Sequence, residues 1–123
     1  MVEDRTNSYY TKLLDGLQTL YEGMDGSQEK NDSPPSFPYM YFFQIGGDGA
    51  IGTLSGTEDG INLAYEVRFY SKSSPNNVRK IANSARAIMI EKLDFQCTYF
   101  RPLENVADST IYQFITRFAK LET

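Results

Sequence analysis

The fold is indicated most clearly by residues 61–93, INLAYEVRFYSKSSPNNVRKIANSARAIMIEKL. The first ten of these residues set Ile61 and every second residue after it against a more polar set, which is the period of a strand. Ser74-Pro75 then supplies an N-cap and a proline at the first helical position. Apolar residues follow at helical spacing, namely Val78, Ile81, Ala82, Ala85, Ile88, Met89 and Leu93. The stretch therefore predicts a strand followed by a helix that crosses over a sheet.

The N-terminal part of the chain predicts a second amphipathic helix over residues 5–24. Its apolar residues recur every three or four positions, as Tyr10, Leu13, Leu14, Leu17, Leu20, Tyr21 and Met24. Gly23 or Gly26 would supply a left-handed stop. The following residues 25–38 are polar and contain three prolines, so they predict a surface connection in which helix and central strand are both disfavoured.

The remaining segments predict strands. Residues 39–45 are apolar on both faces, and the Gly46 to Gly49 turn leads to a weaker return strand over 50–56. After the second helix, strands are expected at 96–101 and 109–121, with a loop between them. The sequence thus predicts one α+β domain over 1–123, with its sheet-helix body at 39–121. The predicted sheet is mixed but mainly antiparallel and is packed by two helices, in the order α-β-β-β-α-β-β.

The last predicted strand is apolar on both sides. Tyr112, Phe114 and Phe118 lie on one face, whereas Ile111, Ile115, Ala119 and Leu121 lie on the other. Either the two helices cover both faces of the sheet, or one face is buried against another copy of the chain.

The composition argues against most enzyme classes. The chain has no histidine and a single cysteine, Cys97, so it lacks the usual general base and the common nucleophile systems. Gly46 to Gly60 lacks the Gly-Lys-Ser/Thr ending of a phosphate loop. We expect no catalytic, cofactor-binding or metal site, and we expect Cys97 to be inert. A net charge of −4 without a basic cluster argues against a stable grip on nucleic acid, and no apolar run is long enough to span a membrane.

Three stretches together resemble the tail terminator or head-tail joining proteins of long-tailed bacteriophages, also called tail completion or minor capsid proteins. They are FPYMYFF, LAYEVRFYSK and RPLENVADSTIYQFITRFAKLE. The resemblance covers most of residues 5–121. It implies a mixed α/β fold and a ring, commonly of six subunits, that caps the tail tube and docks on the head connector. DNA passes through such a ring without specific binding, in the neck of a virion assembled in the host cytoplasm.

Ring closure needs two different patches on each subunit, and we expect head-to-tail contacts that involve the terminal strand. The expected interface residues are Tyr39, Tyr41, Phe43, Tyr112, Phe114 and Phe118. The glycine-rich hairpin, with Gly47, Asp48, Gly49, Glu58 and Asp59, is expected to face the channel or the next ring. A head-completion subunit, a cytoplasmic adaptor dimer and a small enzyme that uses carboxylates, Lys80 or Lys92 stay open as alternatives.

Overall fold

The computed structural model describes residues 6–28, 34–46, 61–104 and 110–122. Its elements are α1 (Thr6–Leu20), β1 (Asp25–Ser27), β2 (Tyr39–Gly46), β3 (Ile61–Ser71), α3 (Pro75–Glu91), β4 (Gln96–Glu104) and β5 (Tyr112–Glu122). The predicted α+β class, with one mixed sheet packed by two helices, is confirmed, as is the element order α-β-β-β-α-β-β.

The five strands form one sheet in the order β1-β2-β3-β5-β4. β1 is parallel to β2, and every other neighbouring pair is antiparallel. The C-terminal strand β5 therefore inserts between β3 and β4, which are joined by α3. β4 and the three-residue β1 are the two edges. Because β5 lies between β3 and β4, its backbone N–H and C=O groups form hydrogen bonds within the subunit.

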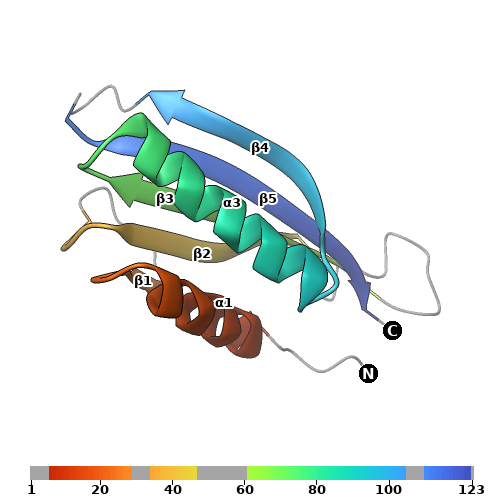
Figure 1. Ribbon diagram of the computed structural model, residues 1–123. Coiled ribbons are helices and arrows are strands. Elements are labelled where there is room, and N and C mark those ends of the chain that lie inside the picture. The colour runs from red at the N-terminus through yellow and green to blue at the C-terminus, as the bar shows by residue number, and fades with distance from the viewer. Residues whose placement is uncertain (1–5, 29–33, 47–60, 105–109, 123) are drawn as a thin grey trace.

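Both helices pack on the same face of the sheet, as Figure 1 shows. Leu13 and Leu17 of α1 and Ile81 and Met89 of α3 are almost fully buried against it. The sheet contributes alternate residues to this core, among them Met40, Phe42, Tyr65, Val67, Phe69, Phe114 and Phe118. The sequence analysis left two explanations for a last strand that is apolar on both sides. Because α1 and α3 lie on the same face, these two helices do not cover both faces of the sheet.

The start of α3 matches its prediction. Ser74 is the N-cap, its Oγ accepts a hydrogen bond from the Asn77 N–H at 3.0 Å, and Pro75 occupies the first turn. All seven residues of the predicted apolar side, from Val78 to Leu93, are buried.

Several predicted boundaries need correction. α1 ends at Leu20 instead of residue 24, and Leu20 is 60% exposed, because the chain turns through the left-handed Gly23 before entering the sheet. Tyr9, which was not predicted, occupies the core. β1 lies within the stretch predicted as a connection. Pro102, Leu103 and Glu104 belong to β4 and not to a loop, since an edge strand tolerates proline. The predicted strand at 50–56 lies outside the described residues.

Candidate assembly surface

The second face of the sheet carries neither helix, and we call it the helix-free face. Strand register arranges its side chains in rows across β2, β3, β5 and β4, and three of these rows hold its aromatic and charged residues. The rows are Tyr39, Tyr70, Gln113 and Leu103; then Tyr41, Arg68, Ile115 and Arg101; then Phe43, Glu66, Arg117 and Tyr99. The face is therefore a mixture of aromatic and charged residues, in contrast to the apolar face beneath the helices.

A buried ion-paired group lies at the middle of the helix-free face. The Glu66 side chain is only 4% exposed, and its two carboxylate oxygens accept hydrogen bonds from Arg68 Nε at 2.6 Å and Arg117 Nε at 2.9 Å. Burial by itself would lower the pKa of Arg68, but Glu66 and Tyr70 outweigh that effect and raise the pKa above its usual value. Glu66 is thus engaged on both oxygens and holds two arginines in fixed positions.

Aromatic residues cover the part of this face that β2 and β3 form. The Tyr41 ring lies 5.1 Å from that of Tyr39 and 5.4 Å from that of Tyr70, and all three residues are buried. The Gln113 amide donates a hydrogen bond of 3.0 Å to the Tyr70 hydroxyl. Phe37, Phe43 and Ile111 pack around this cluster. These residues consequently stabilise the subunit itself.

The part of the helix-free face along β4 is open to solvent. Tyr99 is 38% exposed and Leu103 is 44% exposed, although both are large apolar side chains. Arg101 is exposed as well, and the Arg117 side chain is 47% exposed. The Tyr99 ring lies 5.0 Å from the Arg117 guanidinium and 6.0 Å from that of Arg101. We call Tyr99, Arg101, Leu103 and Arg117 the β4 patch. It combines exposed apolar area with two guanidinium groups, of which that of Arg117 is paired with Glu66.

The six predicted interface residues divide between the two faces of the sheet. Tyr39, Tyr41 and Phe43 lie on the helix-free face. Phe114 and Phe118 lie beneath the helices with at most 1% of their surface exposed, and Tyr112 packs against the same core. The aromatic rings from β5 are therefore used inside the subunit. The predicted hairpin residues from Gly47 to Asp59 lie outside the described residues.

The β4 patch could be found only in part from the sequence. Tyr99 stands out as an aromatic residue in a predicted strand, and Arg101 and Arg117 are visible as strand arginines. Nothing local indicates that β4 is an edge or that Glu66 lies opposite Arg117, because both facts depend on the insertion of β5 between two earlier elements.

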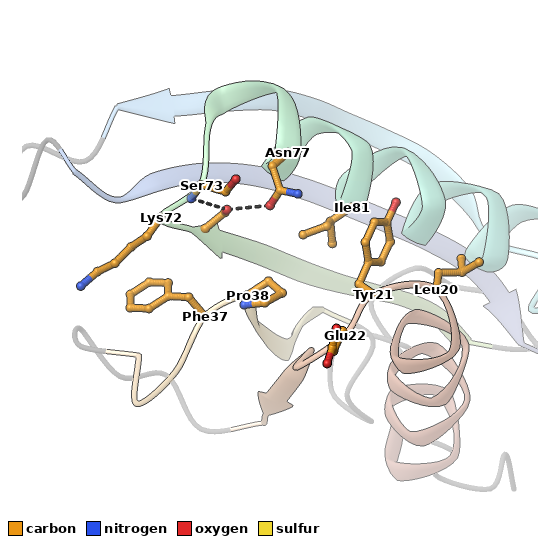
Figure 2. A pocket seen from close by; sticks show the side chains of 10 residues that line it. Leu20, Tyr21, Glu22, Phe37, Pro38, Lys72, Ser73, Asn77 and Ile81 are labelled. Carbon is orange, nitrogen blue, oxygen red and sulfur yellow. Dashed lines mark hydrogen bonds between the residues drawn. The ribbon is translucent and has the colours of Figure 1, made fainter.

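A pocket of about 420 Å³ lies at the end of the sheet where β2 begins and β3 ends (Figure 2). Lys72 extends beside Phe37, with its Nζ 4.9 Å from the ring centroid. Ser71 Oγ donates to Asn77 Oδ1 at 2.7 Å and accepts from the Ser73 N–H at 3.1 Å. The polar groups on this wall are therefore bonded to one another. Leu20, Glu22 and Pro38 form part of the opposite side.

Cys97 sits on β4 and is partly buried. Burial raises the pKa of its thiol, an effect that the backbone of Tyr99 and the charge of Arg86 only partly offset. The group is thus less ionised near neutral pH than a free thiol, which is unfavourable for a nucleophile. Among the described residues there is no group of three or more His, Cys, Asp or Glu side chains that could hold a metal ion.

Comparisons of the chain with protein-family models and with curated proteins found no match. Of the helices in the described part of the chain, neither α1 nor α3 has the length and apolar character that crossing a membrane requires.

Proposed function

We propose that this chain is a non-enzymatic structural subunit of a long-tailed bacteriophage or prophage. In this proposal it is a tail terminator or head-tail joining protein that forms a ring. The ring caps the tail tube, joins it to the head connector in the neck of the virion, and lets DNA pass through its centre. The sequence resemblance suggests the biological setting, and the surface of the subunit supplies an independent argument for assembly.

The observation that carries the proposal is the exposed β4 patch. On this edge strand an aromatic and a leucine side chain are exposed together beside two arginines, which is typical of a surface that contacts another protein. Tyrosine and arginine are the side chains most enriched at the centres of protein interfaces. The patch is thus better suited to contact another protein surface than to remain in water.

The polar groups that the fold brings together also favour assembly over catalysis. Both oxygens of Glu66 are bonded to arginines, and Ser71 is bonded to Asn77 and to the backbone of Ser73. A general base or nucleophile needs an available lone pair aimed at a substrate. These groups instead fix the positions of neighbouring side chains.

The charge of the chain is compatible with a DNA conduit. With a net charge of −4 on each subunit, the ring would repel DNA phosphates, so that DNA would slide through instead of binding. A ring with these properties would have a passive role in the passage of the genome.

The proposal is tested by measuring the mass of the purified chain by light scattering over a range of concentration and salt. Negative-stain images of the large species would be taken alongside, followed by a pull-down with the tail-tube protein of the same phage genome. We expect a closed ring with a central hole that binds the tube protein. A stable dimer that ignores the tube protein would overturn the proposal and favour a cytoplasmic adaptor.

A further inference from the structure

The pocket shown in Figure 2 is formed by segments that lie far apart in the sequence. They are the end of α1 with the turn after it, residues 37–38, the end of β3 with the residues that follow, and the first two turns of α3. The volume of about 420 Å³ falls within the range of roughly 300 to 1,000 Å³ that is typical of sites for small ligands. The apolar part of the lining consists of Leu20, Tyr21, Phe37, Pro38 and Ile81. The pocket can therefore hold an apolar group such as a single large side chain.

One wall of the pocket presents hydrogen-bond donors. Asn77 Oδ1 accepts the hydrogen bond from Ser71 Oγ, which leaves the Asn77 Nδ2 group without a partner among the described residues. Figure 2 shows Nδ2 on the side of the amide that is turned toward Ile81. Lys72 contributes an ammonium group that lies over the Phe37 ring and has no carboxylate partner in the described part of the chain. This wall consequently combines an oriented amide donor with one positive charge.

The opposite side of the pocket presents an acceptor. Glu22 is exposed in the turn after α1, and it is the one acid among the described residues that line the pocket. The Tyr21 hydroxyl is turned to α3, where it bonds the Lys80 carbonyl at 3.0 Å and Ser84 Oγ at 2.7 Å, so the ring of Tyr21 is the part that lines the pocket. The pocket thus has donors and a positive charge on one side, an apolar lining, and a carboxylate on the other side.

We propose that this pocket binds an apolar residue with a free α-carboxylate. The carboxylate accepts a hydrogen bond from Asn77 Nδ2 and is neutralised by Lys72, and such charge-assisted hydrogen bonds are stronger than neutral ones. The apolar side chain packs on Ile81 and its neighbours, and the N–H group of the same residue is directed to Glu22. This residue is the C-terminus of a partner chain or a free amino acid, which share this chemistry. The inference goes beyond the proposed ring and does not depend on it.

The test is ligand-observed saturation-transfer NMR with the full-length chain and N-acetyl-leucine, which carries the carboxylate, the apolar side chain and the N–H group. Two matched probes each lack one part, since N-acetyl-leucine amide has no carboxylate and acetate has no apolar side chain. We expect N-acetyl-leucine to bind more tightly than either matched probe by about tenfold or more, because each matched probe leaves part of the site unused. Equal binding of N-acetyl-leucine and its amide would overturn the proposal, as would absence of binding.

Two variants locate the ligand in the pocket. Asn77→Asp keeps the acceptor for Ser71 and adds a carboxylate near the N-terminus of α3, which favours the helix, so this variant should fold while it repels the ligand. Lys72→Gln removes the positive charge. We expect each variant to weaken the binding of N-acetyl-leucine by about fivefold or more.

The matched control is Lys92→Gln, which makes the same change as Lys72→Gln at the C-terminal end of α3, away from the pocket. It should bind N-acetyl-leucine as the wild type does, and circular dichroism should show all variants folded. Unchanged binding in both pocket variants would overturn the assignment of the site.

Free leucine identifies the source of the bound residue. Its ammonium group would face Glu22, whereas the acetyl group of N-acetyl-leucine occupies the position where a chain would continue. Tighter binding of N-acetyl-leucine supports the C-terminus of a partner chain, and tighter binding of leucine supports a free amino acid. Glu22→Gln should weaken the binding of leucine more than that of N-acetyl-leucine, because only leucine brings a positive charge to this side of the pocket. Equal effects on both probes would overturn the proposed orientation of the ligand.

Discussion

Glu66 of β3 and Arg117 of β5 lie directly opposite each other on the helix-free face, with 2.9 Å between the carboxylate oxygen and Arg117 Nε. Arg68 bonds the second oxygen of the same carboxylate. The three side chains differ in exposure, at 4% for Glu66, 22% for Arg68 and 47% for Arg117. They should therefore respond differently to substitution.

Glu66→Gln should destabilise the subunit by about 1 to 3 kcal/mol, because two guanidinium groups lose their charged partner in a partly buried setting. Arg117→Gln should cost only about 0 to 1 kcal/mol, since water can replace the contacts of a half-exposed group. Urea unfolding at neutral pH measures both values. The reverse ranking would mean that Glu66 does not organise this face.

Phe118→Asp should prevent folding. The residue is fully buried beneath the helices, so the substitution places a carboxylate where it has no water, at a cost of about 4 kcal/mol or more. Tyr99→Asp changes an exposed residue of the β4 patch and should leave the fold intact while weakening assembly. Circular dichroism and sedimentation separate the two outcomes. A Phe118→Asp variant that folds but stays monomeric would contradict the buried position of the Phe118 side chain.

Ser74→Ala should lower the free energy of unfolding by about 1 kcal/mol, because the Asn77 N–H at the start of α3 loses its acceptor. Ser73→Ala is the matched control, as the neighbouring Ser73 is exposed and only its backbone N–H takes part in the bond to Ser71. Chemical unfolding of the two variants gives the comparison. Equal losses would argue against the cap.

Gly26→Ala should destabilise the β1 edge, whereas Gly16→Ala should be nearly neutral. A Cβ at Gly26 would lie 3.0 Å from the Met40 carbonyl oxygen and 2.8 Å from Met40 Cγ, so β1 would have to move away from β2. A Cβ at Gly16 would meet only the end of the Ile88 side chain, and the gain in helix propensity offsets that contact. We expect about 1 to 3 kcal/mol for the first substitution. Thermal unfolding would show whether the ranking holds.

The raised pKa of Cys97 makes stability depend on pH in a defined direction. The unfolded chain loses the thiol proton at the usual thiol pKa, while the folded chain holds it to higher pH. The folded state is therefore favoured below the usual value, and this contribution is lost as pH rises through the raised one. The unfolding free energy of the wild type, measured relative to Cys97→Ala, should fall over that alkaline range. A constant difference would contradict the shift.

The sequence by itself determined the elements whose signals are local. Ser74-Pro75 and the helical spacing after it placed α3, and the alternation from Ile61 to Tyr70 placed β3, because capping and periodicity act over a few residues. The fold class followed from the order of these elements. The charged and aromatic composition of the helix-free face was already present in the strand sequences.

Only the tertiary structure decided which strands became neighbours and which face the helices cover. β5 inserts between β3 and β4, and this places Arg117 beside Glu66 and makes β4 an edge. The packing of both helices on one face put Phe118 in the core and left Tyr99 exposed. An apolar strand fits either side of a sheet equally well, so the choice depends on the burial of all the elements together and on contacts far apart in the chain.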